Sequence, residues 1–330
     1  MQHWHELGFF LGEAVIVVIA LLLIVAGVLT LLAKGKMASG QLKIVKVNDE
    51  LMETREALLN ALDDKEAIKA FKKTAKKTLQ EAKAERKALS EPRRKRVFVL
   101  DFCGDIKASQ VSQLRAEITA VLQVAEISDE VVIRLESPGG VVHGYGLAAS
   151  QLARLRERKI PLTVCVDKVA ASGGYLMSCV ANQIIAAPFA IIGSIGVVAQ
   201  IPNVHRLLKK HDIDFEQITA GEFKRTLTVF GENTDQAREK MRGDLEEIHV
   251  AFKDYIAANR SGVNIEHVAT GEHWLASDAL KLHLVDRLMT SDDYLGFASL
   301  HADVYSITTP VKRNLSQKLG FLAKTYLSQW

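Results

Sequence analysis

The chain has 330 residues, 48% of them hydrophobic and 25% charged, which gives ample apolar material for one large core or two modest ones. Its net charge of +3 gives no overall indication of nucleic-acid binding. The cysteines lack CxxC spacing and do not support a disulfide framework. Because each lies in an apolar run, we expect all three to be small buried side chains: Cys103, Cys165 and Cys179.

Residues 14–33 are twenty residues in a row without a charge. At the rise of an α-helix this run measures about 30 Å, the thickness of the hydrocarbon core of a bilayer. Two acids and no Lys or Arg precede it, and Lys34 and Lys36 follow it, a pattern unlike that of a cleaved signal peptide. We therefore expect a short N-terminal tail, residues 1–13, and an uncleaved transmembrane anchor that binds the lipid bilayer through residues 14–33.

A basic helical extension is expected at residues 34–92. Residues 34–96 contain 18 Lys and Arg against 10 Asp and Glu. Apolar residues recur at helical spacing from Leu51 to Leu89, which predicts a long amphipathic helix with a break near Asp63. The basic surplus suits contact with anionic lipid head groups, and it equally suits a solvated helix face.

The residues after position 93 alternate between strand and helix patterns. Near-continuous Val and Ile runs separated by helices predict parallel strands covered on both faces, an α/β fold. Strands are expected at 96–102, 131–136, 162–166, 215–219 and 304–307, and helices at 109–124, 145–158, from 172 onward, 235–259 and 265–288.

A second apolar run, residues 184–201, is interrupted by Pro188, Gly193 and Ser194. Short buried strands joined by turns explain it better than a second membrane span. We place the main domain at residues 93–300 and a C-terminal strand and basic amphipathic helix at residues 301–330.

Two glycine-rich segments follow buried strands. In Ser137-Pro-Gly139-Gly140, adjacent glycines allow a sharp turn and expose N–H groups that can bind a developing oxyanion, although an ordinary strand–helix turn fits as well. In Ala171-Ser172-Gly173-Gly174-Tyr175, the serine hydroxyl points out of a tight turn. The N–H of Gly173 is a further oxyanion donor, while Ser172 is equally suited to cap the helix that follows.

A third segment, Gly221-Glu-Phe-Lys224, contains a candidate general base. A lysine acts as a base only when desolvation removes its charge near neutral pH. Phe223, Leu227 and Phe230 are apolar neighbours in the sequence, but most lysines of any chain are simply solvated.

Together these segments resemble the signal peptide peptidase A family of membrane serine proteases, from the anchor to about residue 300. In that family the nucleophile is the serine of an ASGGY segment, here Ser172. The general base is the lysine of a later G-x-x-K loop, here Lys224. The serine of a GS-x-G-V segment, here Ser194, orients that lysine. The resemblance further implies an oxyanion hole formed by Gly173 with Gly139 or Gly140.

The resemblance also implies a fold and a setting. The fold expected from it is a ClpP/crotonase-like stack of ββα units, preceded by one transmembrane helix and the charged extension. The family assembles into homo-oligomeric rings or domes, in which the dyad is sometimes completed by two subunits. Its substrates are extended apolar peptides, such as signal-peptide remnants or misfolded membrane and secreted polypeptides. No cofactor, metal or nucleic-acid partner is expected.

The resemblance points to the bacterial inner membrane and leaves the side of the catalytic domain open. The lysines that follow the anchor and the unpaired cysteines favour the cytoplasm. Signal peptide peptidases of this family generally act on the outer side.

Three alternatives to the dyad hypothesis remain. A Ser–His–Asp triad would use His143 and Asp167 with Ser172. Acyl-CoA chemistry uses the same fold and similar glycine-rich turns. The third alternative is a non-catalytic membrane scaffold with a peptidase-like fold.

Overall fold

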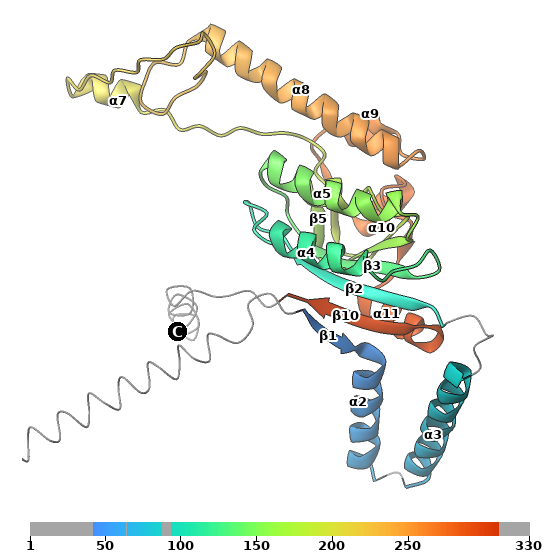
Figure 1. Cartoon of the computed structure of the whole chain (residues 1–330). Helices are drawn as coiled ribbons and strands as arrows, with labels where there is room; N and C mark the ends of the chain where they lie inside the picture. Colours follow the sequence, from blue (N-terminus) through green and yellow to red (C-terminus); the bar gives the residue numbers. More distant parts are fainter. Residues whose placement is uncertain (1–41, 64, 88–93, 310–330) are drawn as a thin grey trace, which may run out of the picture. The chain divides into compact units, whose positions relative to one another are not determined.

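The computed structural model describes residues 42–63, 65–87 and 94–309 (Figure 1). Residues 44–308 form one compact unit, so the boundaries predicted after residues 92 and 300 both fall inside it. The predicted anchor at 14–33 lies outside the described residues, as do residues 310–330 of the predicted C-terminal segment. No helix among the described residues is both long enough and apolar enough to span a bilayer.

Seven strands form the main sheet, in the order β1-β10-β2-β3-β4-β6-β9, and the five pairs from β10 to β9 are all parallel. The fold is therefore mixed α/β, as predicted. Four predicted strands are confirmed as β2, β3, β4 and β10, whereas β1 and β9 have no counterpart in the prediction. The bounds are β1 Lys43–Lys46, β2 Arg96–Cys103, β3 Glu130–Glu136, β4 Leu162–Val166, β6 Gln183–Ala186, β9 Arg287–Leu288 and β10 Asp303–Thr308.

Both faces of the main sheet are covered. Because side chains alternate along a strand, Val97 and Val99 of β2 face one side while Phe98 and Leu100 face the other. The first pair belongs to a buried cluster with Leu295 of α11 (Ser291–His301). On the opposite side, α4 (Val111–Val121) packs on β2 and α5 (Val142–Glu157) on β4.

A second sheet of three short strands carries the candidate site. Strand β5 (Val169–Ala171) pairs parallel with β7 (Ile191–Gly193), which pairs antiparallel with β8 (His273–Leu275). In chain order, β4 of the main sheet is followed by β5 of the second sheet and then by helix α6 (Gly173–Ser178). The run at 184–201 forms parts of β6 and β7, which confirms the prediction of short strands at that position.

Residues 197–259 extend away from the two sheets. They contain α7 (His205–Lys210) and the long helix α8 (Asp235–Asn259), whose predicted bounds are confirmed. The hydroxyl of Thr234 caps α8 by accepting from the N–H of Ala237. Of the residues of α8, Ile256 is buried and the others retain exposure.

Two predictions in this part of the chain are wrong. Residues 215–219 form no strand; they are exposed and pair with no other strand. The single helix predicted at 265–288 is replaced by α9 (Ile265–Val268), β8, α10 (Ala276–Lys281) and β9. The helix is interrupted where Gly271 takes a φ of +86°, and Trp274 then pairs with Ile192 of β7.

The predicted helical extension is a hairpin of α2 (Val47–Ala61) and α3 (Lys65–Lys87). The predicted break is confirmed, with Asp63 at a φ of +51° between the helices. Lys72 pairs with Glu56 at 3.1 Å, and the Arg55 guanidinium lies 5.2 Å from the centre of the Phe71 ring.

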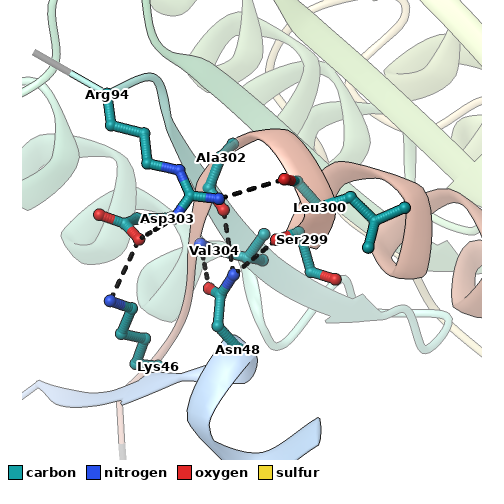
Figure 2. Close-up of polar contacts among 8 residues, drawn as sticks. All are labelled: Lys46, Asn48, Arg94, Ser299, Leu300, Ala302, Asp303 and Val304. Atoms are coloured by element: carbon teal, nitrogen blue, oxygen red, sulfur yellow. Dashed lines mark hydrogen bonds and ion pairs between the residues drawn. The ribbon is translucent and has the colours of Figure 1, made fainter. Parts of the chain in front are cut away.

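The base of the hairpin is attached to strand β10 by polar contacts (Figure 2). The side-chain amide of Asn48 donates to the carbonyl oxygens of Ser299 (2.9 Å) and Ala302 (3.0 Å). Its carbonyl oxygen accepts from the N–H of Val304 at 2.8 Å. A single Asn side chain thus caps the C-terminal end of α11 and fixes the start of α2 beside β10.

One cysteine departs from the prediction. Cys165 and Cys179 are buried, but Cys103, at the end of β2, is exposed. It lies beyond the part of the strand that the helices cover, so the apolar run before it does not bury it.

Candidate active site

Ser172 lies in a strained turn between β5 and α6. Its φ of +52° and ψ of −118° are unusual for a residue with a side chain. Such a conformation costs about 1–3 kcal/mol and persists only where the surroundings fix it. Here the N–H of Ser172 donates to the carbonyl oxygen of Gly193 at 2.7 Å.

The hydroxyl of Ser172 does not cap helix α6 and makes no hydrogen bond within the described part of the chain. This excludes the capping role that the sequence left open. The turn instead presents an unengaged hydroxyl at the N-terminus of a helix, the arrangement of a nucleophile on a strand–turn–helix.

The Ser137–Gly140 turn packs directly against Ser172. Gly139 has a φ of +90°, and a Cβ placed on it would lie 2.7 Å from Cβ of Ser172 and 2.8 Å from the backbone N of Gly173. The carbonyl oxygen of Ser137 accepts from the N–H of Ala171 at 3.0 Å, which joins the two turns. The structure therefore brings the two glycine-rich segments together, and only glycine fits at position 139.

A buried chain of hydrogen bonds shapes this turn. The N–H of Gly139 donates to Oγ of Ser137 at 3.1 Å, and that oxygen lies 2.6 Å from the hydroxyl of Tyr145. The Tyr145 hydroxyl donates to the carbonyl oxygen of Asp105 at 2.9 Å. Burial raises the pKa of Tyr145 despite the opposing effect of its hydrogen bond with Ser137, so the phenol stays protonated and keeps donating.

Sequence reasoning missed the roles of Ser137 and Tyr145. Both are fully buried. The Ser-Pro-Gly-Gly segment and the tyrosine that follows it can be recognised in the sequence. The groups that their hydroxyls contact depend on the fold. The same chain of hydrogen bonds distinguishes the two glycines, because the N–H of Gly139 is engaged whereas that of Gly140 has no partner among the described residues.

Ser194 is adjacent to this cluster. Gly193 accepts from the N–H of Ser172, and Ser194 follows it with a φ of +53°. The N–H of Ser194 donates to the carbonyl oxygen of Glu272 at 2.6 Å. The Ser194 side chain is half-buried, and its hydroxyl has no partner in the described part of the chain.

Lys224 lies elsewhere in the single chain. It occupies an exposed loop whose backbone folds on itself through a bond from the Lys224 N–H to the carbonyl oxygen of Gly221 (3.2 Å). The neighbouring Phe223 ring lies 5.7 Å from Nζ of Lys240, near the start of α8. Among the described residues the Lys224 amine has no ion pair or hydrogen bond, either with Ser172 or with any other group.

The contact between Phe223 and Lys240 places the Lys224 loop beside the N-terminal part of α8. At its other end the helix is attached to α5, where Asn259 accepts from Arg156 at 3.0 Å. From Lys240 to that end the helix rises about 30 Å. The structure therefore groups Ser172, Ser194 and the three glycines, but within one chain it does not add Lys224 to them.

The segment that carries Lys224 exposes many large apolar side chains. Seven of them are between 44% and 93% exposed: Val198, Leu207, Ile213, Phe215, Ile218, Phe223 and Phe230. The rings of Phe215 and Phe230 lie 5.5 Å apart, so part of this apolar surface is contiguous. Contiguous exposed apolar patches commonly mark interaction sites.

The alternative triad has no geometric support. The carboxylate of Asp167 accepts from the N–H (2.8 Å) and the hydroxyl of Ser291, and so caps α11. His143 is exposed in the first turn of α5.

Comparison with known protein families gives two matches along the chain. The model described as "Peptidase family S49 N-terminal" matches residues 3–152, and that described as "Peptidase family S49" matches residues 154–305.

Among curated proteins, the chain is 47% identical to "Probable protease SohB" of Haemophilus influenzae, over 95% of this chain and 91% of that protein. It is 56% identical to "Probable protease SohB" of Buchnera aphidicola subsp. Schlechtendalia chinensis, over 69% of this chain and 74% of that protein. Among solved structures, a mutant of the "1510-N membrane-bound stomatin-specific protease" in complex with a substrate peptide matches at 16% identity and a TM-score of 0.43, covering 72% of this chain and 100% of that one.

Proposed function

Because this chain belongs to peptidase family S49 and is therefore a serine peptidase, we propose that Ser172 is its nucleophile and Lys224 its general base. The observation that carries the proposal is the strained turn at Ser172, whose hydroxyl is unengaged beside two glycine-rich segments. Backbone strain of this kind is stored where function requires it.

In the proposed reaction, the Ser172 oxygen bonds to the scissile carbonyl carbon while the hydroxyl proton passes to the amine of Lys224. The C–N bond then breaks and the leaving amine takes that proton. Water, deprotonated by the same lysine, hydrolyses the acyl-enzyme ester and restores the hydroxyl.

We assign the oxyanion hole to the N–H groups of Gly173 and Gly140. Gly173 is the first residue of α6, where backbone N–H groups have no partner within the helix. Gly140 is preferred to Gly139, because the N–H of Gly139 already donates to Ser137. Two such donors are worth about 2.7–4 kcal/mol each in the barrier.

We further propose that Lys224 reaches Ser172 of a neighbouring subunit in a homo-oligomer. Two observations support this: the Lys224 loop lies beside the N-terminal part of α8, whereas the other end of that helix is attached to α5, and the segment exposes large apolar side chains. Burial of this surface against a second copy would shield the amine from water and favour its uncharged form. Ser194, next to the turn that holds Ser172, would orient the incoming amine.

The proposed substrates are extended apolar peptides, such as signal-peptide remnants or misfolded membrane and secreted polypeptides. The proposed setting is the bacterial inner membrane, with residues 14–33 as the anchor. Both follow from the motifs shared with signal peptide peptidases and from the uncharged run near the N-terminus.

A fluorophosphonate probe tests the nucleophile directly. We expect the full-length protein to be labelled, with the adduct mapped to Ser172 by peptide mass spectrometry. The Lys224→Ala variant should label at least about 100-fold more slowly, because general-base catalysis typically contributes 10²–10⁴-fold. Labelling that persists unchanged in Ser172→Ala would refute the assignment, and the absence of any labelling would favour the scaffold alternative.

A further inference from the structure

Helix α3 carries a stripe of lysines. Its 23 residues contain nine Lys and Arg and three acidic residues. Four of the lysines fall within an arc of about 80° on the helix surface, because successive residues are about 100° apart. All four are exposed and have no partner among the described residues: Lys65, Lys69, Lys73 and Lys76. We call these four residues the lysine stripe.

The stripe works against the stability of its own helix. Lys65 and Lys69, and Lys69 and Lys73, are spaced i, i+4, at which like charges destabilise a helix. Helix α2, against which α3 packs, has no buried residue, so the hairpin gains little from apolar burial. A helix with so few buried contacts should open readily. An anionic partner bound along the stripe would remove the repulsion.

The stripe remains accessible beside the partner helix. The side of α3 that meets α2 is occupied by Phe71, under Arg55, and by Lys72, paired with Glu56. The stripe lies on the adjoining side of α3. The two helices also differ in charge. Helix α2 has four acidic residues and one arginine, whereas α3 is strongly basic.

The hairpin is attached to the main sheet at both of its ends. The carboxylate of Asp303 pairs with Lys46, just before α2, at 3.1 Å and with Arg94, beyond α3, at 3.4 Å (Figure 2). The Asn48 side chain adds the three hydrogen bonds described above. These contacts fix the first turn of α2 at the start of β10.

We propose that the lysine stripe docks α3 onto the anionic head groups of a lipid bilayer. Clusters of lysines on an amphipathic helix next to a membrane span are attracted by anionic lipid. The uncharged run at 14–33 ends nine residues before β1 begins, and nine residues reach at most about 30 Å. A bilayer that holds this run therefore brings its surface close to the part of the chain from which the hairpin extends.

A bilayer fits the stripe better than a nucleic acid does. The stripe contains lysines alone, without the arginines and stacking aromatic residues that support nucleic-acid recognition. The acidic helix α2 next to it would repel a polyanion that wraps around the hairpin. Docking of the stripe rests on the proposed anchor and is independent of the catalytic residues.

Hydrogen exchange of the full-length protein in nanodiscs tests the proposal. Amides of residues 65–87 should exchange at least about fivefold more slowly in discs with about 30% phosphatidylglycerol than in phosphatidylcholine discs, because docking suppresses opening of the helix. Helix α8, which is also exposed, should exchange equally in both. The protection should disappear at about 0.5 M salt, where screening is strong, without any change to the protein.

Charge reversal identifies the residues responsible. The difference in hydrogen exchange of residues 65–87 between the two kinds of disc should vanish in the variant Lys65→Glu, Lys69→Glu, Lys73→Glu, Lys76→Glu. It should persist in a control with the same change in net charge on exposed residues elsewhere: Lys107→Glu, Arg115→Glu, Arg158→Glu, Lys159→Glu. Equal exchange of α3 in both lipids, or equal loss in both variants, would overturn the proposal.

Vesicle flotation after alkaline extraction tests separately whether residues 14–33 anchor the chain. If the chain is extracted, the same two variants are compared for flotation with anionic vesicles, and binding that does not depend on the stripe contradicts the proposal. Tight binding of a short DNA duplex through the stripe, with no effect of anionic lipid, would instead assign the stripe to nucleic acid.

Discussion

The Tyr145 hydroxyl links Ser137 to the Asp105 carbonyl in the hydrogen-bond chain that shapes the Ser137–Gly140 turn. Because the Tyr145 hydroxyl donates its proton to the Asp105 carbonyl, the Ser137 hydroxyl donates to Tyr145. Removing the Tyr145 hydroxyl therefore leaves the buried Ser137 O–H without an acceptor, which costs about 1–3 kcal/mol. We predict that Tyr145→Phe lowers the free energy of unfolding by that amount and also lowers kcat, since the Gly139–Gly140 turn loses its support.

The matched control is Tyr175→Phe. Tyr175 is equally buried, but its hydroxyl donates to the carbonyl oxygen of Leu284 at 3.0 Å, away from the Ser137–Gly140 turn. A similar loss of stability with unchanged kcat is expected, from denaturant unfolding and peptide hydrolysis measured in parallel. If Tyr145→Phe lowers kcat no more than Tyr175→Phe does, Tyr145 has a purely structural role.

Gly139 offers a second test at the same scale. Gly139→Ala places a Cβ 2.7 Å from that of Ser172, at a φ of +90°. We expect a loss of more than about 100-fold in kcat/KM, because the displaced turn can no longer stabilise the oxyanion. Gly146→Ala, in helix α5, meets no atom within 4 Å and should leave activity intact while stabilising the helix by about 0.5–1 kcal/mol. Full activity of Gly139→Ala would refute the packing of the two turns.

The candidate site could be predicted from the sequence in part. The motifs pointed to Ser172, Ser194 and the glycines, and the structure places these residues together. The engagement of the Gly139 N–H could not be predicted, because it depends on the Ser137 and Tyr145 hydroxyls, which meet only in the fold. In our proposal the partner of Lys224 belongs to a second subunit, and the motifs of one sequence do not indicate contacts between subunits.

At the scale of elements, the Asn48 side chain joins the hairpin to the end of α11 by two hydrogen bonds and to β10 by a third. Asn48→Ala should lower the free energy of unfolding by about 2–3 kcal/mol, since two carbonyl groups and one N–H lose their partner. Asn48→Asp keeps the acceptor for Val304 but places a carboxylate against the carbonyls of Ser299 and Ala302.

We therefore expect Asn48→Asp to be at least as destabilising as Asn48→Ala. Thr54→Ala is a control within the same helix, because its exposed hydroxyl bonds only to Glu50 one turn earlier. Thermal unfolding followed by circular dichroism measures all three. A change of less than about 0.5 kcal/mol for both Asn48 variants, the usual range of surface substitutions, would contradict the role assigned to this side chain.

Elements with a strong local pattern could be predicted, and elements defined by distant partners could not. Strands β2 to β4 are apolar runs, and α8 has a capping threonine and helical periodicity. By contrast, β8 takes its form from pairing with β7, and β1, a short strand with lysine at both ends, from lying next to β10. Tertiary contacts outweigh local preference in these segments.

At the scale of the whole molecule, we expect one folded chain to be an incomplete peptidase. Its candidate nucleophile and oxyanion donors lie together, whereas the proposed base lies on an exposed apolar segment beyond α8. The chain would then be inactive as a monomer, and activity would rise with oligomerisation. Polar substitutions of the exposed apolar side chains, such as Ile218→Asp, should reduce oligomer size and hydrolysis together, as measured by light scattering and peptide cleavage.

The most direct test of the dyad mixes two inactive variants. Ser172→Ala and Lys224→Ala subunits, carrying different tags, are co-expressed and the mixed oligomers purified on both. If each site combines the serine of one subunit with the lysine of the next, about a quarter of the sites in a random mixture are intact, and about a quarter of the wild-type peptidase activity returns. Mixed oligomers that stay as inactive as either variant alone would contradict a dyad shared between subunits.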